Sequence, residues 1–230
     1  MGCILVYMLE GINEVIALAD ALRTPLLRLH LNSQSVQDPK VLQTVTEHAL
    51  RDIDAFITTY SEAKSAQLQI EPISLGSILL DTSQRLSSYA KVADIALVVD
   101  DHSKHQLVLG NAKLLSTGLE MITKTLCDFV SDFPDPIVTM RADTRHGYPR
   151  LGVYRNDIEL TAHDVQLAKK LIGGARVNAG LFQQLGALRM VIAGRLLEPL
   201  GLTLRSAKSA GNRGLALQLV PSSQVGLFNI

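Results

Sequence analysis

A helical stretch near the N-terminus, ALADALRTPLLRLH, combines an acidic side chain, Asp20, with an internal proline, Pro25. A proline inside a helix removes a backbone hydrogen bond and costs about 3 kcal/mol, so it indicates a helix that must loosen locally. A carboxylate can accept a phosphoryl group as an acyl phosphate, but this chemistry normally needs a metal ion and neighbouring acidic groups. No such groups stand near Asp20, and we expect it to be a solvated carboxylate.

The other side chains of chemical interest form no recognisable Ser-His-Asp or Cys-His set. Asp100, Asp101, His102 and His105 stand close together in the stretch DDHSKH, which leaves a metal site there as an open alternative. The mixture of acidic and basic residues is more typical of an exposed loop. We therefore predict that the chain has no metal site.

The composition excludes several function classes. The 230 residues contain 22 basic and 22 acidic side chains, so the chain lacks the basic excess that nucleic-acid binding requires. The isolated Cys3 and Cys127 fit reduced thiols of a cytosolic protein. The run CILVYML is shorter than the roughly 20 residues of a membrane span. We expect a cytoplasmic protein that meets a membrane only through an N-terminal segment missing from this chain.

Two apolar patterns with steps of three and four predict an antiparallel helical hairpin over residues 1–66. The first pattern consists of Val15, Ala19, Leu22, Leu26, Leu29, Ser33 and Val36. The second follows the turn SVQDPK and consists of Leu42, Val45, Ala49, Ile53, Phe56, Tyr60 and Ala63. One hairpin buries a single stripe on each helix, so we expect two copies to form a dimeric four-helix bundle.

The helical period ends at QLQIEPISLG, and residues 67–230 are predicted to form a second domain. Helices are expected over 74–91 and 111–130, at TAHDVQLAKKLI with Thr161 as its cap, and at FQQLGALRMVIAGRLLEPLG. Strands are expected over 95–100 and 106–110, in a pair that turns near His146-Gly147, and in a final hairpin around Gly211–Gly214. This order predicts an α/β sandwich with helices over one face of a mixed sheet, within an overall α+β fold.

The sequence resembles the transmitter of bacterial sensor histidine kinases, whose H-box is usually written S-H-E-L-R-T-P-L. The matching residues, within 17–26, are Leu22, Arg23, Thr24, Pro25 and Leu26. The domain order also agrees, because such kinases combine a dimerising hairpin with a Bergerat-type ATPase domain. The resemblance implies that Asp20 stands where the phosphoacceptor histidine would be, so the H-box is degenerate.

The resemblance also implies a degenerate magnesium site. The N-box, N-L-x-x-N-A in the family, corresponds to the run LEMITKT, which places Glu120 and Lys124 at the two asparagine positions. A protonated lysine is a donor only and cannot hold Mg²⁺. Glu120 and Lys124 are also four residues apart in the order that favours a helical ion pair, and we expect a surface pair.

The adenine-binding loop, D-x-G-x-G in the family, is degenerate as well. Its aspartate corresponds to Arg155 and its glycines to Asp157 and Glu159; a slip of the alignment would put Asp157 at the adenine-reading position. The glycines that remain at lid and strand positions are Gly174, Gly186 and Gly214. We expect no bound cofactor, with Mg-ATP as the cofactor if the site still functions.

We therefore interpret the chain as a non-catalytic, homodimeric scaffold or regulator of two-component signalling. Its expected partners are a response regulator receiver domain, docking near residues 16–30, or a partner histidine kinase. One alternative is an active ATP-dependent histidine kinase with divergent boxes. Another is a histidine phosphotransfer protein, for which His30 is the available histidine on the hairpin.

Overall fold

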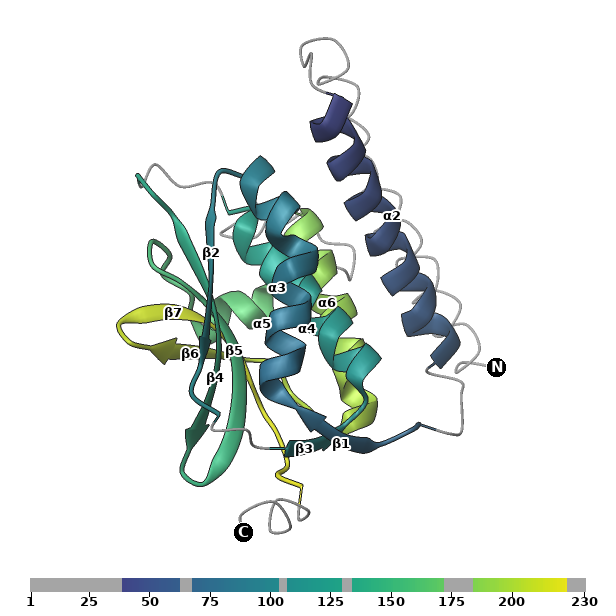
Figure 1. The fold of residues 1–230 in the computed structure, drawn as a ribbon, viewed down its shortest axis with the longest axis vertical. Helices are drawn as coiled ribbons and strands as arrows, with labels where there is room; N and C mark the ends of the chain where they lie inside the picture. The colour runs from purple at the N-terminus through teal and green to yellow at the C-terminus, as the bar shows by residue number, and fades with distance from the viewer. Residues whose placement is uncertain (1–38, 63–67, 104–106, 130–133, 172–183, 223–230) are drawn as a thin grey trace.

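A computed structural model describes residues 39–62, 68–103, 107–129, 134–171 and 184–222 of the chain. A sheet forms one side of the molecule, a layer of helices covers one face of it, and a further helix, α2, leans against the outside of that layer (Figure 1). The helices are α2 (Pro39–Glu62), α3 (Leu75–Val92), α4 (Ala112–Cys127), α5 (Ala162–Leu171) and α6 (Gln184–Leu197), followed by the short 3-10 turn η1 (Glu198–Leu200).

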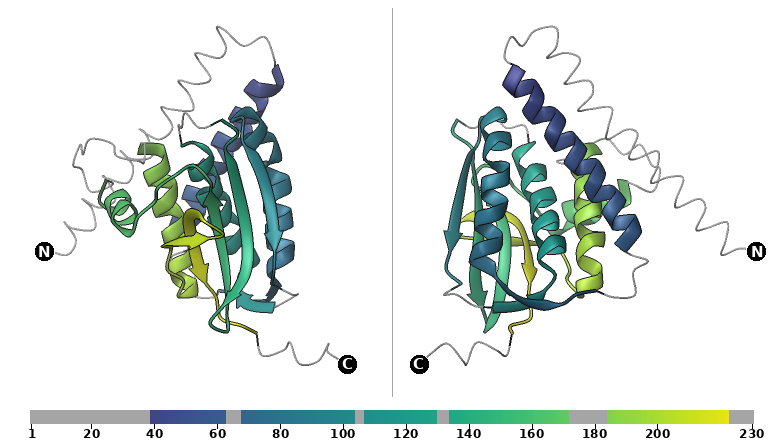
Figure 2. Two further views of the ribbon diagram at one scale, coloured as in Figure 1. Left: turned by 90° about the vertical axis from the view of Figure 1, so that its left-hand side faces the viewer. Right: turned by 45° about the vertical axis from the view of Figure 1, so that its right-hand side comes forward.

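The main sheet has five strands in the order β2-β4-β5-β7-β6, in which β2 and β4 are parallel and the other pairs are antiparallel. These strands are β2 (Ala96–Asp101), β4 (Ile137–Arg145), β5 (Tyr148–Arg155), β6 (Arg205–Ser209) and β7 (Asn212–Gln218). A separate two-stranded sheet joins β1 (Glu71–Ser74) to β3 (Leu107–Gly110). The predicted mixed sheet with helices on one face is therefore confirmed (Figure 2).

Local sequence signals determine where the elements begin and turn. Pro39 opens α2, a position where its missing N–H costs nothing. Asn111 caps α4 by accepting a hydrogen bond from the Leu114 amide at 3.0 Å. The predicted cap at Thr161 is confirmed, because its hydroxyl accepts from the Asp164 amide while the Asp164 carboxylate accepts from the Thr161 amide. Such reciprocal bonds satisfy free donors at a helix start.

The core lies between the helices and the sheet and is aliphatic, as the low aromatic content predicts. Helix α4 is its centre, since α3 and α6 pack on its two sides and β4 and β5 lie beneath it. Its fully buried apolar side chains include Leu115, Met121 and Leu126. Cys127, at the end of α4, is a free thiol whose pKa is raised to about 12 by burial and by the neighbouring Asp128.

Helix α2 is the only described part of the predicted hairpin, and it packs against α3 and α6. Of its described side chains, only His48 and Ala55 are buried. Leu50 and Ile57 point outward and are 56% and 57% exposed. Residues 1–38, the bundle and the domain division at residue 66 stay predictions. None of the helices in the described ranges is both long and apolar enough to span a bilayer.

Two details differ from the sequence prediction. The stretch EPIS was read as part of a boundary, but it forms β1 and pairs with β3 from Glu71↔Gly110 to Ser74↔Leu107. The final turn lies at Ala210-Gly211, both with positive φ, and Gly214 lies inside β7 opposite Tyr154. A Cβ at Gly214 would overlap the Val153 carbonyl oxygen and stand 2.6 Å from Cα of Tyr154. Gly214 therefore permits a close approach of two strands.

This close approach predicts that Gly214→Ala is strongly destabilising, because the clash is with backbone that cannot move aside. We expect a loss of about 3 kcal/mol or more in the free energy of unfolding, measured by urea denaturation. Gly194→Ala is the matched control, since a Cβ at that position in α6 meets no atom within 4 Å. The control should be neutral or stabilising by up to about 1 kcal/mol. Equal effects of the two substitutions would refute the packing argument.

Candidate functional site

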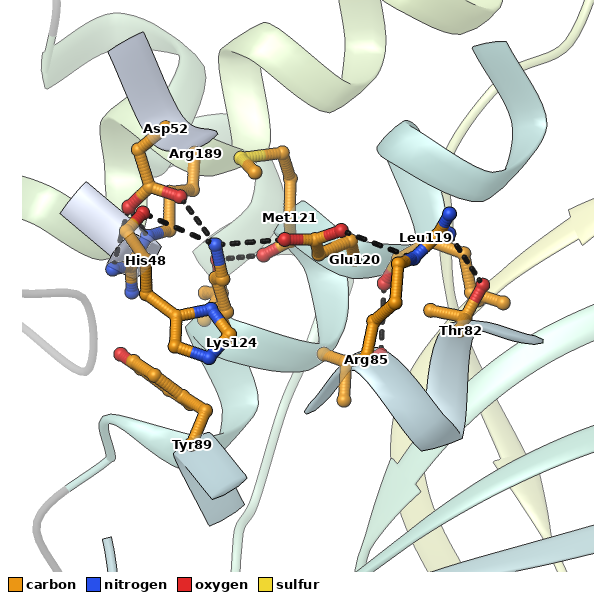
Figure 3. A network of polar contacts seen from close by, with 12 residues as sticks. His48, Asp52, Thr82, Arg85, Tyr89, Leu119, Glu120, Met121, Lys124 and Arg189 are labelled. Atoms are coloured by element: carbon orange, nitrogen blue, oxygen red, sulfur yellow. Dashed lines mark hydrogen bonds and ion pairs between the residues drawn. The ribbon is translucent and has the colours of Figure 1, made fainter. Parts of the chain in front are cut away.

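The two residues at the N-box positions lie on α4, on the side that faces α2 and α3 (Figure 3). Their side chains are almost inaccessible, with Lys124 0% and Glu120 8% exposed. The predicted ion pair is present at 2.9 Å between the Lys124 Nζ and a Glu120 carboxylate oxygen. The expectation that it lies on the surface was wrong, because α2 and α3 cover this side of α4.

A carboxylate from α2 joins this pair. One oxygen of Asp52 lies 2.7 Å from the Lys124 ammonium, and the other lies 2.8 and 2.9 Å from two nitrogens of the Arg189 guanidinium. Lys124 also donates to the His48 backbone carbonyl at 3.4 Å. Asp52 therefore bridges a cation on α4 and a cation on α6, and it ties α2 to both helices (Figure 3).

The network continues to the end of α4 and to α3. The Arg189 guanidinium binds the Asp128 carboxylate at 2.5 Å, and the Tyr89 hydroxyl donates to the other Asp128 oxygen at 2.6 Å. On the opposite side, Arg85 of α3 lies 3.8 Å from the Glu120 carboxylate. Each buried carboxylate of this network thus meets at least one cation, as burial of charge requires.

The electrostatics follow from burial and from this pairing. Burial alone would raise the pKa of Asp52, but the neighbouring Arg189 and Lys124 outweigh it and hold the pKa below its ordinary value. The pKa of Tyr89 is raised well above its ordinary value by burial and by Asp128. Burial and the charges of Lys124 and Arg51 lower the pKa of His48 to about 4. At neutral pH, His48 is therefore neutral.

The residues at the adenine-loop positions form a second buried pair. The Arg155 guanidinium binds both carboxylate oxygens of Asp157 at 2.5 and 2.8 Å, and both side chains are 1% exposed. The same guanidinium donates to the backbone carbonyls of Leu126 and Phe129 at 2.6 and 2.9 Å. Arg155 therefore supplies hydrogen-bond donors to carbonyl groups at the C-terminal end of α4. Both carboxylate oxygens of Asp157 are bound to Arg155, so neither is free for an adenine amino group.

The remaining predicted site residues are scattered. The Glu159 side chain is 85% exposed and lies 3.5 Å from Arg213. Gly186 is buried in the first turn of α6, and Gly214 serves the strand contact described above. The predicted residues that lie outside the described ranges are Asp20, Leu22, Arg23, Thr24, Pro25, Leu26, His30, His105 and Gly174.

The open alternative of a metal site at DDHSKH is only partly within the described chain. His102 lies 2.6 Å from an Asp100 oxygen, and the second Asp100 oxygen is paired with Arg141. Within the described ranges, no group of three or more histidine, cysteine, aspartate or glutamate side chains could hold a metal ion.

Sequence reasoning missed most members of the network. Asp52 and Arg189 are 137 residues apart, so no local spacing connects them. The usable signal was the charge of Arg189 within the apolar run GALRMVIAGRLL, because a charge on an otherwise apolar helix needs a buried partner.

No known protein-family profile matches the sequence, and no curated protein matches it. Solved histidine kinase structures do resemble the fold. Histidine kinase AdeS of Acinetobacter baumannii aligns with a TM-score of 0.54 at 12% identity, covering 86% of this chain and 96% of AdeS. Full-length ShkA in complex with AMPPNP aligns with a TM-score of 0.55 at 13% identity, covering 94% of this chain and 46% of ShkA. A nucleotide-free catalytic domain of ThkA aligns with a TM-score of 0.53 at 7% identity, covering 66% and 96%. The chain therefore has the fold of histidine kinase catalytic domains.

The second buried pair predicts a large cost for Arg155→Met, because Asp157 and two backbone carbonyls would lose their buried donor. We expect a loss of about 3–5 kcal/mol in the free energy of unfolding, measured by urea denaturation. Arg213→Met is the control, since its partner Glu159 is exposed, and it should cost less than about 1 kcal/mol. If Arg155→Met lowers the free energy of unfolding as little as the control does, the buried pair does not stabilise the packing of α4.

The environment of His48 predicts an acid-sensitive structure. Since the pKa is lowered in the folded state, the unfolded chain takes up the proton first as the pH falls below about 6.5. We expect a loss of about 2 kcal/mol between pH 6.5 and 4, and Asp52, whose pKa is also lowered, adds a loss in the same direction at lower pH. His48→Gln should abolish the loss in the free energy of unfolding that occurs between pH 6.5 and 4. Urea denaturation at a series of pH values measures this loss. His163→Gln, on exposed α5 surface, controls for loss of a histidine, and an unchanged profile in His48→Gln would contradict the assignment.

Proposed function

We propose that the chain is a non-catalytic, histidine-kinase-like protein of two-component signalling that acts by binding. The observation that carries this proposal is the internal pairing of the charges at the nucleotide-motif positions. Glu120 and Lys124 are buried against each other, and Arg155 is held by Asp157 and two carbonyls. A working nucleotide site needs such groups to be free to meet a ligand.

The residue types support the same proposal. Kinases hold Mg²⁺ through oxygen ligands, and the Mg²⁺ bridges the nucleotide phosphates, whereas Lys124 brings an ammonium group to the predicted ligand position. Adenine recognition needs an acceptor for the exocyclic amino group, and a guanidinium such as that of Arg155 has donors only. Helix α2 also contacts α4 at the predicted N-box position, since His48 and Asp52 of α2 both bind the Lys124 ammonium.

The proposed partners are a second copy of this chain and either a response regulator receiver domain or a partner histidine kinase. The outward face of α2 supports helix pairing, because Leu50 and Ile57 are one heptad apart and more than half exposed. Apolar side chains at that spacing pack against another helix in bundles. The docking segment for a receiver domain is expected at residues 16–30, outside the described ranges.

One observation favours an active kinase as the alternative. ShkA, whose fold resembles this one, was solved in complex with AMPPNP. An active enzyme would bind Mg-ATP and transfer its γ-phosphate to a residue of the hairpin.

Thermal denaturation with and without nucleotide separates the two functions. We expect millimolar Mg-ATP to shift the melting temperature no more than an equal concentration of Mg-tripolyphosphate, because Arg155 and Asp157, at the predicted adenine-loop positions, are bound to each other. Specific binding at 100 times the dissociation constant would stabilise the protein by about 2.7 kcal/mol, a shift of several degrees. An additional shift of that size with Mg-ATP, together with label transferred from γ-labelled ATP, would establish the kinase instead. A known active histidine kinase provides the positive control.

A further inference from the structure

The surface of the helical layer beneath α2 carries an unbalanced positive charge. Three cations, Arg85, Lys124 and Arg189, are in contact with two carboxylates, Glu120 and Asp128. The body formed by α3, α4 and α6 therefore has one excess cation at this place. Asp52 of α2 places a carboxylate on two of these cations, but α2 also brings Arg51, whose charge acts on the neighbouring His48. The assembled site therefore keeps one positive charge in excess.

The geometry around Asp52 is that of an oxyanion site. Its two oxygens are divided between an ammonium at 2.7 Å and a guanidinium at 2.8 and 2.9 Å. A planar guanidinium fork beside a lysine point charge is the combination that proteins use for carboxylate and phosphate groups. Lys124 and Arg189 are 0% and 4% exposed, so this anion is enclosed by protein when α2 is in place.

Among the described side chains of α2, Asp52 makes the ionic contacts to α4 and α6, while Ala55 is the one apolar side chain that is fully buried. The described buried side chains of the helix are a histidine and an alanine, while Leu50 and Ile57 face outward. Burial of an alanine contributes little free energy, and His48 packs edge-on against Tyr89 with ring centroids 4.8 Å apart. An anion that replaced the Asp52 carboxylate would thus remove a principal contact of the helix.

We propose that Lys124 and Arg189 form a latent binding site for a phosphoryl group, that Asp52 occupies this site as an internal substitute, and that a bound phosphoryl group and docked α2 exclude each other. A phosphoryl group carries more charge and more oxygens than a carboxylate, so it competes for the same two cations. By linkage, such a ligand shifts α2 from the docked to the released state. This inference goes beyond the proposed function, since it involves no adenine, no Mg²⁺ and no phosphate transfer.

Hydrogen exchange of the unaltered chain provides the first test. The amides of residues 39–62 are monitored while inorganic phosphate, tripolyphosphate or magnesium-free ATP is added, with sodium chloride matching the ionic strength. We expect exchange in α2 to rise about tenfold or more at saturation, while α4 keeps its protection. Equal effects of tripolyphosphate and ATP would identify the phosphoryl group as the ligand, and release by ATP alone would contradict the proposal. Unchanged protection of α2 with all three ligands would overturn it.

Asp52→Asn provides the second test, because it keeps the shape of the side chain and removes its charge. We expect α2 exchange to rise about tenfold without ligand, and tripolyphosphate to bind at least about tenfold more tightly by calorimetry than to the unaltered chain. The matched control is Asp54→Asn, two residues away at an exposed position of the same helix, which should change neither quantity. If α2 exchanges faster in Asp52→Asn but tripolyphosphate binds no more tightly than to the unaltered chain, the proposed phosphoryl site is wrong. If Asp52→Asn fails to fold, the exchange experiment on the unaltered chain decides alone.

Discussion

Lys124 and Arg189 are buried in the helical layer, and the Asp52 carboxylate lies between them. Uncompensated charges in a protein interior are costly, so this triad has to form or the layer has to open to water. The requirement fixes the rotation of α2 about its own axis. With Asp52 turned inward, His48 and Ala55 fall on the same side at helical spacing, and Leu50 and Ile57 fall on the other, as their exposure shows. The one ionic contact thus determines which face of α2 stays available to partners.

The need to pair buried charges also explains the contacts at the C-terminal end of α4. Arg155 stands at the last position of β5 and is buried. It binds the Asp157 carboxylate through two nitrogens, the Leu126 carbonyl in the final turn of α4 and the Phe129 carbonyl just after the helix. Helix ends leave carbonyls without partners, and this guanidinium supplies the donors. The residues that the sequence resemblance assigned to nucleotide motifs thereby stabilise the fold of this chain. Glu120 is paired with Lys124 and Arg155 with Asp157, so these four charges have partners within the protein.

Sequence patterns predicted the fold well and the site poorly. The apolar periods of α3, α4 and α6, the cap at Thr161 and the turn at His146-Gly147 are local, and each was located within a few residues. The pairing of Glu120 with Lys124 was also local and was found, but its burial depends on α2 and α3 packing over it. The tertiary structure alone brings together Asp52, Tyr89 and Arg189. No periodic pattern in the sequence predicts these contacts. The strand β1 was missed because Pro72 in a short polar segment reads as a break.

The account as a whole rests on the energetic coupling between α2 and the body of the fold through Asp52. A double-mutant cycle of Asp52→Ala and Arg189→Ala, measured by urea denaturation at pH 7, tests this coupling directly. The direct contacts at 2.8 and 2.9 Å in a buried setting predict a coupling free energy of about 2 kcal/mol or more. Effects that add to within about 0.5 kcal/mol would mean that the two residues act independently, and would contradict the role assigned to Asp52.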